Sequence, residues 1–182
     1  NFKNKGAKCF IDIGAADGYF AVGMAYSKTF ENIYAFEISH QGQNSITKNA
    51  ALNDCDQLVT VSGEANISSL RNLISKYKRA ALLIDIEGVE YAFLNDAMLD
   101  LLKNCFVVCE LHPWLVERGY ELQNLLLEKS SEIFEVSVMK REYYNPNVFE
   151  EFNDFTDEER LIVVGEGRHK NMEWLILKPK VN

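Results

Sequence analysis

The sequence predicts an α/β fold, in which a mostly parallel sheet of seven strands carries helices on both faces and the last strand runs antiparallel. Short apolar segments and amphipathic segments alternate five times between Lys8 and Lys129, which is typical of a parallel sheet with right-handed crossovers. The segments AALLIDI and CFVVCEL are apolar almost throughout, as expected for strands that are covered on both faces.

The expected strands are short runs of apolar or β-branched residues. Runs with aromatic or β-branched residues, such as NIYAFE and LVTVS, fit this description. In chain order the expected strands are Lys8–Ile13, Asn32–Glu37, Leu58–Ser62, Ala80–Ile86, Cys105–Leu111, Ile133–Val138 and Met172–Leu177.

The expected helices place apolar residues three and four positions apart, as Leu70, Leu73, Ile74 and Tyr77 illustrate. In chain order they are Gly18–Ser27, Gln41–Leu52, Ser68–Tyr77, Val89–Leu102, Val116–Lys129 and Asp157–Val164. The alternation weakens after Lys140, so an irregular insertion or lid is expected at about 141–156. No repeat or linker interrupts the chain, and a single domain over 1–182 is expected.

Composition limits the classes of partner. The chain of 182 residues carries 19 basic and 27 acidic side chains, a net charge of −8, from which we expect no nucleic-acid partner. No apolar run approaches the roughly 18–20 residues that span a bilayer, so no membrane is expected. The four cysteines show no metal or disulfide spacing, which favours a reducing compartment, the cytoplasm. The oligomeric state stays open, a homodimer included.

The loop after the first strand is the first place to seek a ligand, because ligands bind at the carboxyl ends of parallel strands. It reads D-x-G-x-x-x-G-x-F from Asp12 to Phe20. Glycines permit a tight turn and a close backbone approach to a ligand. A dinucleotide fingerprint starting at Gly14 requires glycines where the chain has Ala16 and Tyr19.

A second acid supports a nucleoside-containing cofactor. Glu37 ends the second strand, 23 residues after Gly14, where a carboxylate accepts hydrogen bonds from ribose hydroxyls. Ile38 is expected to cover an adenine ring, with Glu64 and Ala65 at its edge. Because NAD enzymes share the ribose contact, an NAD(P)-dependent oxidoreductase of similar topology stays an alternative.

The D-x-G-x-x-x-G-x-F loop resembles the first motif of class I S-adenosylmethionine (SAM)-dependent methyltransferases, which have a Rossmann-like fold. Segment ALLIDIEGVEYAFLN, with D-x-E-G-x-E from Asp85 to Glu90, resembles FkbM-type methyltransferases, as does the ending Glu110-Leu111-His112-Pro113 of the fifth strand. The resemblance implies SAM as cofactor and O-methylation of a hydroxyl on a sugar or small metabolite. The implied cofactor residues are Asp12, Gly14, Ala15, Asp17, Gly18, Phe20, Glu37, Ile38, Glu64, Ala65 and Asp85.

Asp85, Glu110 and His112 are the expected catalytic residues, because the carboxyl ends of neighbouring strands bring them together. His112 is the preferred general base, since an imidazole with a pKa near 6.5 takes up a proton at neutral pH. An alternative is a divalent metal held by Asp85, Glu87 and Glu110; metal-free catalysis is favoured over it.

The acceptor is expected to lie against Glu87, Trp114, Tyr143 and Tyr144, the aromatic ones stacking on a flat or sugar-like group. A third hypothesis, beside methyltransferase and oxidoreductase, is a SAM-binding module without catalytic activity.

Overall fold

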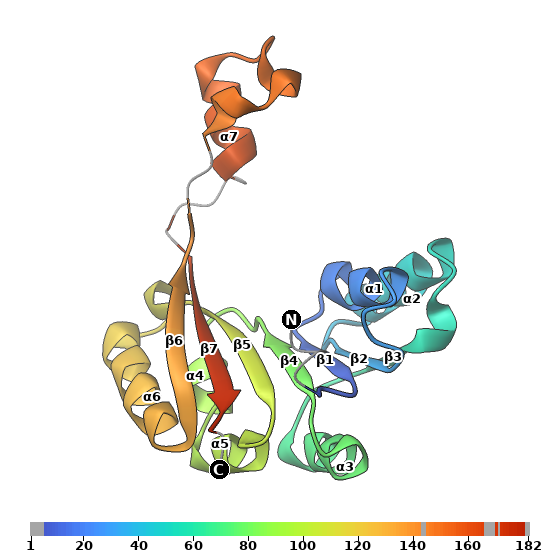
Figure 1. Ribbon diagram of the computed structural model, residues 1–182, viewed down its shortest axis with the longest axis vertical. Helices are drawn as coiled ribbons and strands as arrows, with labels where there is room; N and C mark the ends of the chain where they lie inside the picture. Colours follow the sequence, from blue (N-terminus) through green and yellow to red (C-terminus); the bar gives the residue numbers. More distant parts are fainter. Residues whose placement is uncertain (1–5, 143–144, 166–169, 171, 181–182) are drawn as a thin grey trace.

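The computed structural model describes residues 6–142, 145–165, 170 and 172–180. It contains the expected sheet of seven strands, ordered β3-β2-β1-β4-β5-β7-β6 (Figure 1). Neighbouring strands among β1 to β5 pair in parallel, and β7 pairs antiparallel with both β5 and β6. The strands are β1 (Phe10–Ile13), β2 (Ile33–Phe36), β3 (Val59–Ser62), β4 (Ala81–Ile84), β5 (Phe106–Leu111), β6 (Phe134–Lys140) and β7 (Glu173–Pro179).

Helices cover both faces of the sheet, and two buried clusters show which helix covers which face. One cluster joins α1 and α2 to the sheet through residues such as Ala21 and Ile46. The other joins α3, α5 and α6 through Leu70, Leu99 and Leu126. The helices are α1 (Tyr19–Tyr26), α2 (His40–Leu52), α3 (Ile67–Tyr77), α4 (Glu90–Phe93), α5 (Asp96–Leu102), α6 (Gly119–Ile133) and α7 (Asp157–Gly165), with short 3-10 turns at Asp56–Leu58, Pro113–Leu115, Pro146–Val148 and Glu150–Phe152.

The expected helix Val89–Leu102 is wrong as one element, because the chain breaks it into α4 and α5. Asn95 adopts an extended conformation, and its side chain accepts a hydrogen bond from the Met98 amide. An asparagine in this conformation caps a new helix. The helix expected from Val116 begins instead at Gly119, after Arg118 in a left-handed conformation.

Residues 145–165 form an arm that lies beyond the ends of β6 and β7, away from the rest of the sheet (Figure 1). The arm holds two 3-10 turns and α7. Arg160 joins its parts by donating hydrogen bonds to the carbonyl oxygens of Phe152 and Asn153. Arg141 donates to the carbonyl oxygens of Val164 and Gly165 at the end of α7. The insertion expected at 141–156 therefore extends through α7.

All four cysteines are buried free thiols. Among the described residues, no helix is both long enough and apolar enough to cross a membrane.

Candidate functional site

The loop between β1 and α1 is shaped by two glycines with positive φ, Gly14 (+83°) and Gly18 (+90°). A Cβ atom on Gly14 would overlap the backbone carbonyl of Asp85, after β4. The Gly14 and Ala15 amides both donate to the Phe36 carbonyl oxygen. The loop thus lies against the ends of both neighbouring strands, at a spacing that only glycine permits.

Asp12 stabilises this loop from its buried side. Its side chain is only 2% exposed, and its Oδ2 accepts a hydrogen bond of 3.0 Å from the Ala21 amide in the first turn of α1. Burial raises the pKa of Asp12 to about 7, although the Ala21 hydrogen bond opposes this. In this structure the Asp12 carboxyl therefore holds α1 in place beneath the loop.

We predict that Asp12→Asn flattens the dependence of stability on pH. Because the folded-state pKa lies above the ordinary value of 3.8, the wild type loses stability as pH rises from about 4 to 7. Asparagine keeps an oxygen for Ala21 and carries no charge. Urea unfolding should show the wild type losing on the order of 2–3 kcal/mol relative to D12N across this window. The exposed control Asp154→Asn should follow the wild type; a D12N curve that also does so contradicts this role.

Glu37, just after β2, connects the loop to the start of α2. Its Oε2 accepts a hydrogen bond of 3.0 Å from the Ala16 amide, and its Oε1 accepts one of 2.8 Å from the Ser39 amide. A carboxylate accepts about four hydrogen bonds, so both oxygens keep capacity for a ligand. Gly42 makes room for this side chain, since a Cβ there would lie 2.6 Å from Glu37 Cγ. Sequence reasoning missed Gly42, whose only signal is a glycine in the first turn of a helix.

A cavity of about 420 Å³ opens at the carboxyl ends of β1, β2, β3 and β4, a size suited to a cofactor. Six of the predicted cofactor residues line it: Gly14, Glu37, Ile38, Glu64, Ala65 and Asp85. Val89 and Phe93 also line it and were not predicted. Asp12, Ala15, Asp17, Gly18 and Phe20 do not belong to its lining, although the first four shape its loop.

A second cavity of about 730 Å³ lies between the sheet edge and the arm. Asp85 and Glu110 line it from the sheet, and its apolar wall includes Met139, Phe149, Phe152, Val164 and Trp174. Phe20, expected at the cofactor, lines this cavity instead. Asp85 lines both cavities, so the two open onto the same strand end. The sequence predicted a lid at about 141–156 but not the contacts of Phe149, Phe152 and Val164, because their approach to the sheet depends on the length of the β6–β7 hairpin.

The remaining predicted acceptor residues are placed differently. Trp114 lines neither cavity, and its ring packs edge-on against His112 with ring centroids 5.5 Å apart. Glu87 lines the smaller cavity. Tyr143 and Tyr144 lie outside the described residues.

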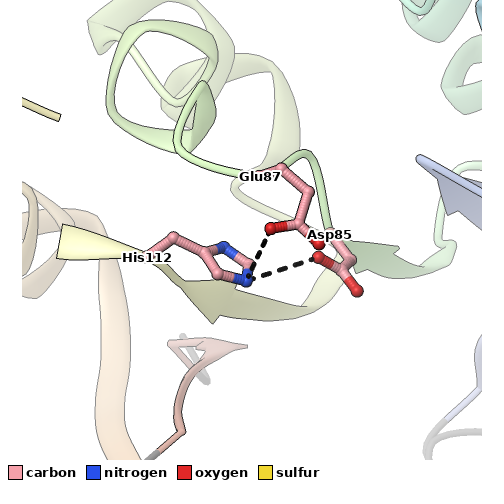
Figure 2. Close-up of side chains that lie close together, drawn as sticks. All are labelled: Asp85, Glu87 and His112. Atoms are coloured by element: carbon pink, nitrogen blue, oxygen red, sulfur yellow. Dashed lines mark ion pairs between the residues drawn. The ribbon is translucent and has the colours of Figure 1, made fainter. Parts of the chain in front are cut away.

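The structure brings Asp85, Glu87 and His112 together at the strand ends (Figure 2). His112 Nε2 lies 3.8 Å from Asp85 Oδ1 and 3.5 Å from Glu87 Oε2. On its other side, His112 Nδ1 lies 2.8 Å from Oε1 of the fully buried Glu90. His112 is only 3% exposed and lines neither cavity, so its role as general base stays a prediction.

Electrostatics links these groups. Burial and the neighbouring Glu110 raise the pKa of Asp85 to about 6. Burial alone would raise the pKa of Glu90, but hydrogen bonds with His112 and the Gly88 amide lower it overall. Burial alone would lower the pKa of His112, but the hydrogen bond and charge of Glu90 and the charge of Glu87 raise it overall. Glu90 is therefore a buried anion that fixes the imidazole.

The group of possible metal ligands in the structure differs in one residue from the group that the sequence predicted. The atoms that lie within 4.8 Å of one another belong to Asp85, Glu87 and His112, whereas Glu110 lines the larger cavity. The sequence prediction placed His112 beside the acids as a softer partner that would suit a transition metal better.

No family model matches the chain, and no curated protein matches it in sequence. Solved structures with this fold are numerous. The methyltransferase domain of bacterial CtHen1-CN has a TM-score of 0.59 at 14% identity, over 97% of this chain and 93% of that one. An O-methyltransferase from Bacillus cereus, in complex with S-adenosylhomocysteine (SAH), has 0.61 at 13% identity, over 97% and 76%. The tRNA m1A22 methyltransferase of Bacillus subtilis has 0.61 at 11% identity, over 96% and 61%.

These likenesses confirm the Rossmann-like fold of class I methyltransferases. They also correct one expectation. Net charge predicted no nucleic-acid partner, and the FkbM resemblance implied a sugar or small metabolite as acceptor, yet proteins with this fold include tRNA methyltransferases. Net charge is a sum over the whole chain and does not describe the surface around one cavity, so it does not exclude nucleic acid here.

Proposed function

We propose that the protein transfers a methyl group from SAM to an oxygen atom of an acceptor. The observation that carries this proposal is the shared position of Asp85, which lines both cavities at the carboxyl edge of the sheet. A group-transfer enzyme requires two substrate cavities that meet at the reacting atoms. The smaller cavity would hold the donor and the larger one the acceptor.

The smaller cavity fits SAM in three respects. Gly14 lets the loop lie close against the strand ends, which leaves space for a ligand above the backbone. Glu37 has free acceptor positions for ribose hydroxyls. Ile38 and Val89, which are 78% and 57% exposed, both line the cavity, and an adenine ring bound there would cover their apolar surface. When bound, SAM supplies an electrophilic methyl group on its sulfonium. The fit to NAD(P) is poorer, because Ala16 and Tyr19 stand where its pyrophosphate loop uses glycine.

Asp85, Glu110 and His112 would position the acceptor and remove its proton. Asp85 and Glu110 contact the acceptor cavity directly, and His112 acts on it through Asp85. The FkbM-like motif from Asp85 to Glu90 supports oxygen as the acceptor atom. The acceptor molecule is not restricted to a sugar or small metabolite.

Labelled SAM tests the proposal. Protein is incubated with methyl-labelled SAM and with separate small-molecule, RNA and protein fractions of a cell extract. Label should appear in an acceptor with wild-type protein and fall at least tenfold with Glu110→Gln, because Glu110 lines only the acceptor cavity. SAH affinity of E110Q should stay within about threefold of wild type. Binding of SAH without transfer to any fraction would overturn the proposal and favour a non-catalytic module.

The arm provides a further prediction. Phe149 lines the acceptor cavity and is 41% exposed, whereas Phe155 is 38% exposed and lines neither cavity. Phe149→Ala should raise the KM for the acceptor about tenfold, the effect of losing an aromatic contact worth about 1–1.5 kcal/mol. The matched control Phe155→Ala should not change it. Equal effects of the two substitutions on KM would contradict the placement of the acceptor.

A further inference from the structure

Three ligand-type atoms face one another at the strand ends: Asp85 Oδ1, Glu87 Oε2 and His112 Nε2 (Figure 2). The imidazole nitrogen lies 3.8 Å and 3.5 Å from the two oxygens. These separations exceed the usual N–H···O distance of about 2.9–3.0 Å. Atoms that each lie about 2.1 Å from one ion are about 3.0–3.5 Å apart. The spacing is therefore close to that of a ligand set around a single ion.

The imidazole is fixed in the orientation that a metal ligand needs. His112 Nδ1 lies 2.8 Å from Glu90 Oε1, which also accepts a hydrogen bond from the Gly88 amide. Because Glu90 Oε1 is already an acceptor for the Gly88 amide, Nδ1 is the side of the ring that donates to it, and Nε2 faces Asp85 and Glu87. Metal-binding histidines typically donate their second N–H to a carboxylate in this way.

One buried atom in the cluster, Asp85 Oδ1, has no hydrogen bond among the described residues. It faces Nε2 of His112 at 3.8 Å, and the His112 side chain is only 3% exposed. Buried polar atoms are normally paired, and one cation between the two atoms would pair with both.

Glu87 closes the site from the solvent side. It has a left-handed φ of +50°, which turns the chain so that its carboxylate lies beside His112, while 74% of its side chain stays exposed. Asp85 and Glu87 both line the smaller cavity and Asp85 also lines the larger one. An ion here would keep open positions toward both.

We propose that Asp85, Glu87 and His112 bind one divalent transition-metal ion at the junction of the two cavities. Two carboxylates and a neutral imidazole carry a charge of −2, which a divalent cation neutralises. One nitrogen and two oxygens favour Mn²⁺ or Zn²⁺ over Mg²⁺ and Ca²⁺, which prefer oxygen throughout.

The role of the ion rests on the proposed methyl transfer, but its binding does not. A divalent ion beside Asp85 would polarise the acceptor oxygen as a Lewis acid and make its proton easier to remove. Glu90 is then a positioning residue that acts through His112.

The test is a titration of metal-free protein with Mn²⁺ in the absence of SAM, in which electron paramagnetic resonance measures free Mn²⁺ and Zn²⁺ serves as a competitor. We expect one site per chain. Glu87→Gln should weaken binding at least tenfold, and because Glu87 is exposed this variant should still fold. Glu90→Gln should weaken it about 10- to 100-fold. The control Glu117→Gln, at an exposed acid five residues from His112, should match the wild type.

Two results would overturn the site: no binding of Mn²⁺ or Zn²⁺ up to about 1 mM, or equal affinity of E87Q and wild type. A separate titration with SAH in metal-free buffer keeps the two proposals apart. SAH binding without metal binding would contradict only the proposed metal site. Metal binding without SAH binding would contradict only the proposed donor site.

Discussion

Gly14→Ala is expected to abolish SAH binding and to lower the free energy of unfolding by about 2–4 kcal/mol. The new Cβ would overlap the Asp85 carbonyl, and φ at this position is +83°, a conformation that alanine rarely adopts. Relief of the overlap must separate the ends of β1 and β4, where the Asp85 amide donates to the Ile13 carbonyl oxygen at 2.9 Å. That movement displaces Gly14 and Asp85, which line the donor cavity. Urea unfolding and titration calorimetry measure the two effects.

Gly23→Ala is the matched control. Gly23 lies within α1, and a Cβ there meets no atom within 4 Å. Alanine in a helix interior is favoured over glycine by about 0.5–1 kcal/mol, so G23A should be slightly more stable than wild type and bind SAH equally well. If G14A bound SAH like G23A, the donor would not lie against the first loop.

Glu37→Ala is expected to weaken SAH binding by about 1–3 kcal/mol, or 5- to 150-fold. The variant loses the carboxylate that would accept the ribose hydroxyls. It also leaves the Ala16 and Ser39 amides without their present acceptor, so the loop that borders the cavity loses its anchor. Calorimetric titration of SAH measures the change.

The control for this prediction is Glu31→Ala, which removes an exposed acid from the loop before β2. E31A should bind SAH as the wild type does. If E37A bound SAH as tightly as wild type and had the same melting temperature, the ribose would not bind at the end of β2.

Strands β1, β2, β4 and β5 could be predicted because each is a short apolar run whose residues are mostly buried, and β3 because of its β-branched residues, although it is only partly buried. Local signals were sufficient there. The break between α4 and α5 depends on how Asn95 caps a new helix, and a continuous helical pattern over 89–102 conceals it. The length of the arm depends on pairing between β6 and β7, which are far apart in the sequence.

The same contrast applies to the site. Gly14, Glu37 and Asp85 could be predicted from their spacing after strands, since parallel strands bring their carboxyl ends to one edge. The burial of His112 and its pairing with Glu90 could not, because α4 must first pack beside β5. Glu90 lies in the first turn of α4, and in the folded chain it orients an imidazole.

A calorimetric titration of the folded wild-type protein with SAH, beside a matched titration with NADH, tests the assignment of the smaller cavity to SAM. We expect binding of one SAH per chain with micromolar affinity and no binding of NADH. Absence of SAH binding, or tighter binding of NADH, would contradict the assignment of the smaller cavity to SAM.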